Sequence, residues 1–326
     1  ANAGQRVAVN LAGIDHKEIE RGMVLAAPGV LGPTQIIDAE LEVLSDAARP
    51  LRTRQRVRVH IGTAEVLARA FVVNEPGTIE PGSKGFVQLR LESPVAAFIG
   101  QRIIVRSYSP QATVAGGVVL RTAPAKYRKR DAQTAAEDLS RLAEASDSHA
   151  KIVHALIHSG GNNGVAAKDI AKETAWRAET LKAAIDGALS AGSGVNVGGT
   201  ILAPDVVKTI RDQTLAALVE FHRREPLASG IPREMLREKV FRYFPIDVFH
   251  SVIDSLQNDG KLVSDNETIR SSEHSTELTP AETKAKLSIL AAYAGARFEP
   301  PKTVDVLSNA ATASGLKPAE TAKVFD

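Results

Sequence analysis

Apolar and polar positions alternate along the first third of the chain, and Gly, Pro or Asn residues interrupt the alternation every few positions. A period of two is that of a β-strand, whose successive side chains point to opposite faces. Six or so short antiparallel strands at this spacing predict a small closed β-barrel. The predicted strands cover residues 1–12, 23–27, 37–43, 54–61, 65–73, 86–91, 102–107 and 118–121.

From residue 124 onward the pattern becomes helical with two brief strand pairs, and this part repeats itself. Each copy has a helix, a Gly-containing loop, a short helix, a longer helix and a β-hairpin, which is the order of a winged helix. A third copy begins near Thr279 and stops at residue 326 before any wing, so we expect a tail that is loosely held or leans on its neighbour. Matching positions lie 68 residues apart: Ile185, Asp186, Gly192, Thr200 and Ile201 against Ile253, Asp254, Gly260, Thr268 and Ile269.

Positive charge is concentrated at two places, although 40 Lys and Arg residues against 38 Asp and Glu residues leave a net charge of only +2. Basic clusters on a near-neutral chain predict a local contact with a polyanion. For the cluster that follows the barrel in the chain, a solvated spacer is the preferred interpretation. The first cluster is Arg49, Arg52, Arg54, Arg56 and Arg58, and the second is Lys126, Arg128, Lys129 and Arg130.

Part of the first cluster has a structural explanation. Opposite charges that face each other across an antiparallel pair stabilise it by a few tenths of a kcal/mol to about 1 kcal/mol. Arg49, Arg52 and Arg54 lie outside such pairing and could contact a phosphate backbone. A hairpin through residues 45–53 would set Glu42 against Arg56, Glu40 against Arg58 and Asp38 against His60.

Several classes of chemistry are not indicated by any motif in the sequence. No G-x-x-x-x-G-K-[ST] phosphate loop and no guanine-reading N-K-x-D occur, and the His residues lack metal-ligand spacing. The chain has no Cys, which excludes disulfides and thiolate metal sites and fits a cytoplasmic protein. No apolar run approaches the ~20 residues that span a bilayer. We therefore expect no catalytic residue, no metal or cofactor site and no membrane contact in this chain.

The third helix of each winged-helix copy does not suit base reading. The helices predicted at 178–191 and 247–259 are rich in Ala and Asp, whereas base readout uses Arg, Lys, Asn or Gln near the helix N-terminus. Spacers or protein-packing modules are the better interpretation.

Two sequence stretches resemble translational GTPases of the EF-Tu kind. Residues 3–14, AGQRVAVNLAGI, and residues 19–26, IERGMVLA, followed by Pro28-Gly29, match the end of the second domain of those proteins. There the arginine of the I-E-R-G turn lies near the 5′ end of the bound aminoacyl-tRNA. The resemblance therefore implies a tRNA phosphate contact for Arg21. The alternative is a turn arginine that caps local carbonyl groups.

A glycine-rich segment narrows the resemblance. Residues 106–117, RSYSPQATVAGG, are similar to the last strands of the third domain of selenocysteine-specific elongation factors of the SelB type, with Ala115 where the first of three glycines usually stands. Tandem winged helices are absent from ordinary elongation and initiation factors. Residues 221–231, FHRREPLASGI, resemble the start of the second SelB winged helix, and residues 272–274 and 278–280 continue that match.

The resemblance implies a multi-domain β + α chain, an EF-Tu-like β-barrel followed by tandem winged-helix domains. We expect the sequence to begin inside a domain and to lack the GTPase domain, which in the full factor holds GTP and Mg. The implied domains are the end of the domain II barrel (1–29), the domain III barrel (30–121), a linker with a helix (122–146), winged helices at 147–204 and 205–276, and a truncated third at 277–326.

The implied partners are selenocysteinyl-tRNA, the ribosome and, through the winged helices, the selenoprotein mRNA hairpin (SECIS), with the last contact weakened by truncation. The chain itself would not be an enzyme. Two other classes stay open: a winged-helix DNA-binding regulator and a structural spacer without RNA affinity. The candidate RNA-binding residues are Arg21, Arg49, Arg52, Arg54, Arg56, Arg58 and Arg106.

Overall fold

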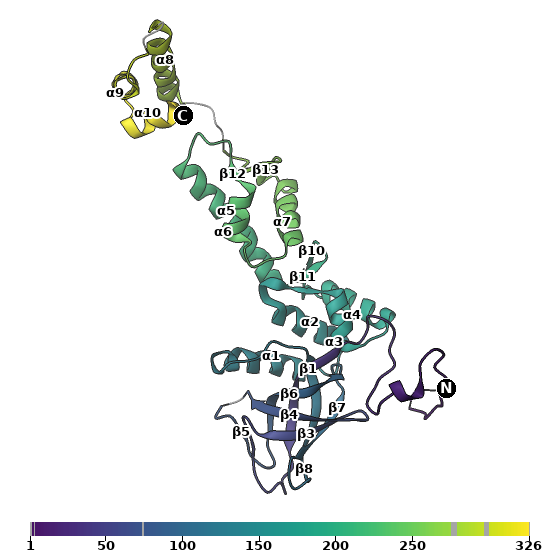
Figure 1. Ribbon diagram of the computed structural model, residues 1–326. Coiled ribbons are helices and arrows are strands. Elements are labelled where there is room, and N and C mark those ends of the chain that lie inside the picture. The colour runs from purple at the N-terminus through teal and green to yellow at the C-terminus, as the bar shows by residue number, and fades with distance from the viewer. Residues whose placement is uncertain (1, 3, 74, 275–278, 297–299, 326) are drawn as a thin grey trace. The chain divides into compact units, whose positions relative to one another are not determined.

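A computed structural model describes residues 2, 4–73, 75–274, 279–296 and 300–325 (Figure 1). Ala3 and Leu278, which belong to the motifs quoted above, lie outside these residues. The chain divides into two compact units, residues 1–204 and residues 205–326, and each is described by itself.

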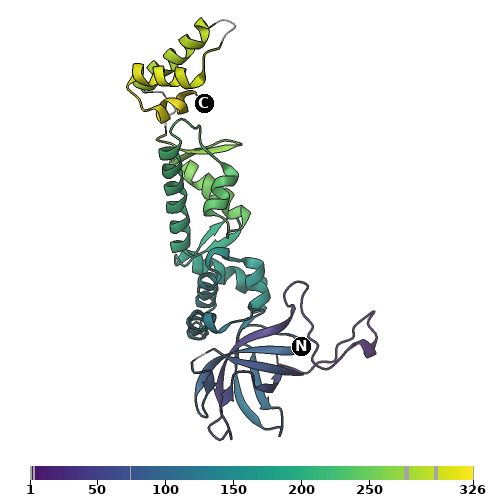
Figure 2. The ribbon, with the colours of Figure 1, turned by 60° about the vertical axis from the view of Figure 1, so that its left-hand side comes forward.

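Six antiparallel strands of the first unit close into a barrel in the order β1-β6-β4-β3-β7-β8, which confirms the predicted barrel. Figure 2 shows these strands from a second side. Two short strands, β2 (Leu51–Arg52) and β5 (Thr78–Ile79), pair separately. The barrel strands are β1 (Pro33–Val43), β3 (Arg56–Ile61), β4 (Ala64–Val72), β6 (Lys84–Ala96), β7 (Arg102–Ser107) and β8 (Thr113–Thr122).

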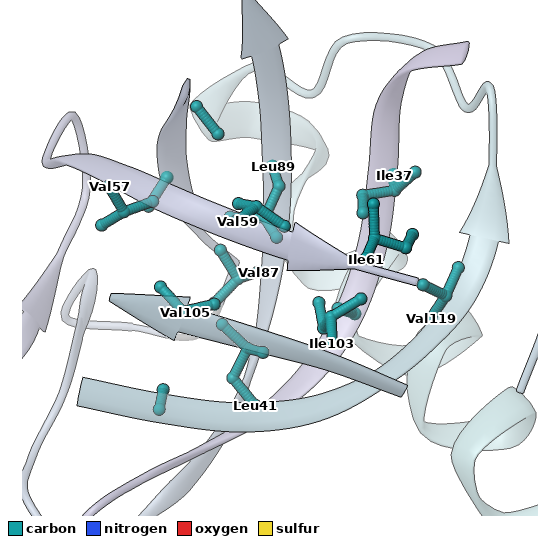
Figure 3. Close-up of a cluster of buried hydrophobic side chains, with 14 of the residues drawn as sticks. Ile37, Leu41, Val57, Val59, Ile61, Val87, Leu89, Ile103, Val105 and Val119 are labelled. Carbon is teal, nitrogen blue, oxygen red and sulfur yellow. The ribbon is translucent and has the colours of Figure 1, made fainter. Parts of the chain in front are cut away.

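The barrel interior is filled by the alternate apolar residues of every strand (Figure 3). A barrel of this size has room only for side chains, and aliphatic residues supply them because aromatic residues make up 4% of the chain. Residues between them point outward, so each strand carries one buried and one outer row. The interior includes Ile37, Leu41, Val57, Val59, Ile61, Val87, Leu89, Ile103, Val105 and Val119.

The predicted strands at 1–12 and 23–27 are wrong. The described residues before Pro33 form only the short 3₁₀ helix η1 (His16–Glu18). A strand needs a hydrogen-bonded neighbour, and no described segment pairs with this one. Its apolar side chains are consequently in solvent, with Val9 61% and Leu25 67% exposed.

Helices and a small sheet follow the barrel within the first unit. α2, α3 and α4 with the three-stranded sheet β10-β11-β9 form a winged-helix arrangement. The order of elements in the sequence repeat predicts this arrangement. The elements are η2 (Lys129–Asp131), α1 (Ala132–Glu144), α2 (His149–Gly160), η3 (Gly161–Asn163), β9 (Val165–Ala166), α3 (Ala167–Thr174), α4 (Ala178–Ser190), β10 (Val195–Val197) and β11 (Thr200–Leu202).

The second unit repeats this order with the sheet β12-β14-β13. Further along the chain, α8, α9 and α10 pack against one another, and Ile289, Val306 and Ala310 form a small apolar cluster there. The elements are α5 (Pro204–Arg224), β12 (Ile231–Pro232), α6 (Arg233–Val240), α7 (Ile246–Asn258), β13 (Leu262–Ser264), β14 (Thr268–Ser271), α8 (Pro280–Gly295), α9 (Thr303–Ser314) and α10 (Pro318–Phe325).

A buried polar network attaches the linker after β8 to the barrel wall. The Asp38 carboxylate is fully buried; Tyr127 Oη donates to its Oδ2 at 2.6 Å and Gln88 Nε2 donates to its Oδ1 at 3.1 Å. Gln88 also donates to Ala125 O at 3.0 Å, and Arg90 Nη2 donates to Tyr127 O at 2.8 Å. This part of the linker is therefore held on the barrel through Ala125 and Tyr127, while Lys126, Arg128, Lys129 and Arg130 are exposed to solvent as expected of a solvated segment.

The first winged helix is tied to the barrel a short distance away. Glu173, near the end of α3, accepts hydrogen bonds from Arg121 Nη2 and from the backbone N–H of Thr122, both at 3.3 Å. The backbone N–H of Ile99 donates to Glu173 O at 2.7 Å. The positive charge of the Arg121 guanidinium thus acts on the carboxylates of both Asp38 and Glu173.

Burial raises the pKa of the Asp38 carboxyl from 3.8 to about 6, against the opposing effects of the Tyr127 and Gln88 hydrogen bonds and of the Arg121 charge. Folding therefore takes up a proton between these two pH values. The stabilising contribution is complete below about pH 3.8 and is lost as the pH rises through about 6. A shift of this size corresponds to roughly 3 kcal/mol.

We predict that Asp38→Asn, which cannot ionise, removes this pH dependence. Relative to the variant, the wild-type free energy of unfolding should fall by up to about 3 kcal/mol between pH 4 and pH 6.5. Urea denaturation at several pH values, followed through the methyl signals of Val57 and Val59 in the barrel core, measures the difference. Parallel profiles for the two proteins would show that Asp38 does not titrate in this range.

Gly117 on β8 allows a close approach of two strands, because a Cβ there would lie 1.9 Å from Glu40 O and 2.9 Å from Leu41 Cδ2. We predict that Gly117→Ala lowers the free energy of unfolding by about 3 kcal/mol or more, since backbone must move. At the neighbouring Gly116 the nearest atom would be 3.8 Å away, so Gly116→Ala should change stability by less than about 1 kcal/mol. Equal losses in the two variants, measured by urea denaturation, would contradict this assignment.

Candidate nucleic-acid interface

Five arginines from four neighbouring strands point outward from the barrel wall. Val57 and Val59 lie in the core, so Arg56 and Arg58 between and beside them face outward. Strand register then sets arginine against arginine: Arg58 is opposite Arg106, Arg56 is opposite Arg69, and Arg69 is opposite Arg90. We call Arg56, Arg58, Arg69, Arg90 and Arg106 the arginine face.

Two carboxylates neutralise part of this face. Arg56 Nε and Nη2 donate to Glu92 Oε1 and Oε2 at 2.9 and 2.7 Å, and Arg58 Nη1 donates to Glu65 Oε1 at 2.7 Å. These hydrogen bonds lower the pKa of Glu92 and of Glu65. Like charges opposite each other are destabilising, so the carboxylates reduce the repulsion across the strands.

The predicted cross-strand pairing of these arginines is wrong. β1 pairs with β6 and β8, while β3 pairs with β4 and β7, so the Glu40 and Glu42 side of β1 does not adjoin β3. His60 is opposite Glu65 and Ile104 instead of Asp38. Both edges of β1 are occupied by strands that are distant in sequence, which leaves none for a hairpin with β3.

Tyr108 adds an aromatic ring to the arginine face. The Cζ atoms of Arg56 and Arg58 lie 4.7 and 5.4 Å from the centroid of the ring, within cation–π range. The loop that carries Tyr108 is closed by hydrogen bonds from Ser107 N to Ala112 O at 2.8 Å and from Ala112 N to Ser107 Oγ at 3.1 Å. Tyr108 as a residue is 43% exposed.

Donor capacity on this face is incompletely used. The buried Nε atoms of Arg58 and Arg106 have no hydrogen-bond partner within the residues that the structure describes. Buried donors are generally satisfied, so these two Nε atoms are exceptions, and their burial means that the outer Nη atoms are the ones a ligand on this face would meet.

The other predicted site residues lie elsewhere. Arg49 is exposed in a bend, Arg52 lies on β2 opposite Thr78, and Arg54 is exposed in the turn before β3. The Nε of Arg21 donates to Thr63 O at 3.0 Å, a carbonyl 42 residues further along the chain and not one within its own turn. The structure therefore brings Arg56, Arg58 and Arg106 together and leaves the other four outside that group.

Arg69 and Arg90 belong to the arginine face but were not among the predicted site residues. The alternation along 65–73 places Arg69 on the outer row, beside the inward Ala68 and Ala70, so the sequence did contain a signal for its direction. Its position opposite Arg56 and Arg90 depends on pairing between distant strands, which no local pattern indicates.

The winged helices present little free positive charge on their third helices. On α4, Lys182 is paired with Asp186 at 2.6 Å. Ser255 of α7 and Asp259, which directly follows α7, accept hydrogen bonds from Arg211 of α5, at 2.7 and 2.5 Å. Within the described residues, no group of three or more His, Cys, Asp or Glu is placed to hold a metal ion, and no helix has the length and apolar content needed to cross a bilayer.

Comparisons with known proteins agree with the two kinds of domain. Residues 38–126 match the family model "Selenocysteine-specific elongation factor, beta-barrel domain", and residues 215–270 match "Elongation factor SelB, winged helix".

Two curated relatives are named selenocysteine-specific elongation factor. That of Desulfomicrobium baculatum is 29% identical over 100% of this chain and 50% of its own length, and that of Haemophilus influenzae is 25% identical over 86% and 43%. A crystal structure of a bacterial selenocysteine-specific elongation factor, EF-Sec, matches 93% of this chain and 46% of its own with a TM-score of 0.57 and 15% identity, a likeness of fold. The chain spans about half the length of the curated relatives.

Proposed function

We propose that this chain is part of a factor that delivers selenocysteinyl-tRNA to the ribosome at UGA codons, because it carries the β-barrel and winged-helix domains of the selenocysteine-specific elongation factor family. In this proposal the barrel binds the tRNA. The winged helices form the part directed to the mRNA hairpin and the ribosome, and GTP with Mg binds in a domain other than these. The work takes place in the cytoplasm, where translation occurs.

The arginine face is the observation that supports tRNA binding. It places five guanidinium groups on one outer surface, two of them over the exposed ring of Tyr108. Arginine donates several hydrogen bonds in a planar fork that fits phosphate oxygens, and each bound phosphate releases counterions. A rigid β wall presents such groups at fixed spacing, which suits the regular backbone of a tRNA stem.

The carboxylates on the arginine face would limit its affinity for tRNA. Arg56 and Arg58 already hold Glu92 and Glu65, so a phosphate must displace or share those carboxylates. Exposed ion pairs are worth only up to ~1 kcal/mol, so this exchange is feasible.

A salt titration tests the proposal. Filter binding of selenocysteine tRNA to the chain should give a clear negative slope of log K against log of the salt concentration, about −0.9 per neutralised phosphate. Arg58→Ala should reduce the slope, whereas Arg6→Ala, an exposed arginine outside the arginine face, should not. A slope near zero would favour the spacer function, and tighter binding to duplex DNA than to tRNA would favour the DNA-binding regulator.

We further predict that freeing the paired arginines strengthens binding. Glu65→Gln and Glu92→Gln should each raise tRNA affinity by up to about fivefold, because the ion pair to be broken is worth up to ~1 kcal/mol. Glu42→Gln is the matched control, since Glu42 is an outward strand carboxylate paired with Lys84 at 3.6 Å. Equal effects of all three changes would indicate general electrostatics instead of a contact at the arginine face.

A further inference from the structure

A hollow of about 520 Å³ lies beside the arginine face and shares Arg69 and Arg90 with it. Its cationic residues come from the separate strand β2, the turn before β3, two barrel strands and the linker. Phe71, Val72 and Val73 contribute to its wall, and Glu75 is the carboxylate among its lining residues. The cations are Arg52, Arg54, Arg69, Arg90 and Lys129.

Most of these cations lack the carboxylate ion pairs that Arg56 and Arg58 form, although the charge of Arg69 contributes to lowering the pKa of Glu92. Within the described residues, Arg52, Arg54, Arg69 and Lys129 form no ion pair with a carboxylate. Like charges gathered around one hollow repel each other, so the arrangement costs free energy unless an anion occupies it. Binding of an anionic ligand would relieve this repulsion, and the relief would make the binding free energy more favourable.

The backbone around the hollow is built to hold Arg54. Its backbone φ of 72° lies in the left-handed region, which a residue with a side chain such as that of arginine seldom adopts. Arg54 N donates to Ala70 O at 2.7 Å, Ala70 N donates to Gln55 O at 2.9 Å, and Thr53 N donates to Gly77 O at 3.0 Å. The strained conformation persists because these bonds fix the turn, and strain of this kind concentrates at functional sites.

Lys129 reaches the hollow because the linker is bound to the barrel. Tyr127, two residues earlier, is held by its hydroxyl on Asp38 and by its carbonyl on Arg90. Arg128 N donates to Asp131 Oδ2 at 2.9 Å, which closes the turn that contains Lys129. The position of Lys129 is thus set by the same buried network that carries the Asp38 carboxylate.

We propose that this hollow is a second phosphate-binding site, which takes the RNA backbone next to the stretch bound by the arginine face, and that Lys129 of the linker completes it. The inference rests on the proposed tRNA function. The cations surround an open hollow from several elements, as a backbone passing through requires, and Arg69 makes the site continuous with the arginine face.

The test compares two hollow variants with two linker controls in the full chain. Arg54→Ala and Lys129→Ala should each weaken binding of a selenocysteine tRNA transcript by about fivefold at low salt and reduce the salt slope by about 0.7 to 0.9. Lys126→Ala and Arg130→Ala remove the same charge from the same linker but do not line the hollow, so they should leave the slope unchanged. An unchanged thermal midpoint shows that each variant is folded.

The outcomes separate the two proposals. Wild-type binding without salt dependence would reject the tRNA function itself. Salt-dependent wild-type binding with equal slopes for Lys129→Ala and Lys126→Ala would keep that function and overturn the hollow. Calorimetry with inorganic pyrophosphate identifies a small-anion site: if pyrophosphate binding is lost in Arg54→Ala while tRNA binding is unchanged, the hollow does not bind RNA and the inference is wrong.

Discussion

A guanidinium group that holds a carboxylate is not free to hold a phosphate, and the outer wall of the barrel is organised by this competition. Arg56 is paired with Glu92 on β6, two strands away, and Arg58 with Glu65 on the adjacent β4, whereas most cations around the hollow form no ion pair with a carboxylate. The two surfaces are adjacent and similar in composition, yet they differ in how much charge they can offer. Charge count alone would rank them equally, and only the pairing distinguishes them.

The buried carboxylate of Asp38 connects this surface to the rest of the chain. A buried charge is costly unless it is hydrogen-bonded, and the partners of Asp38 come from β6 and from the linker. The linker must therefore lie against β1 and β6 for the carboxylate to be satisfied. Arg121 and Glu173 make the neighbouring connection to α3, so polar contacts on one side of the barrel fix both the linker and the first winged helix.

Local periodicity was sufficient to predict the kinds of elements in this fold. The alternation along β3, β4 and β7 and the internal repeat at 68 residues predict a barrel followed by winged helices, because both signals depend on near neighbours in the sequence. The side-chain partners of individual residues were not predictable in the same way. Arg56 binds a carboxylate 36 residues away and Tyr127 binds one 89 residues away, and neither distance leaves a local trace. The prediction of strands before Pro33 was wrong for a related reason. Alternation indicates a strand only where a second strand is present to pair with it.

The pairing of β1 with β8 has a mechanical consequence. Ile37 lies opposite Thr122, and Ala123 N donates to Ile36 O at 2.9 Å, so the chain enters and leaves the barrel at the same end. Tension between the segments on either side of the barrel would therefore peel β1 from β8 one rung at a time, beginning at Ala123, instead of shearing all the rungs together. The Asp38–Tyr127 bond lies beside these first rungs and would bear the load early. Under such tension the barrel would open first where the linker begins.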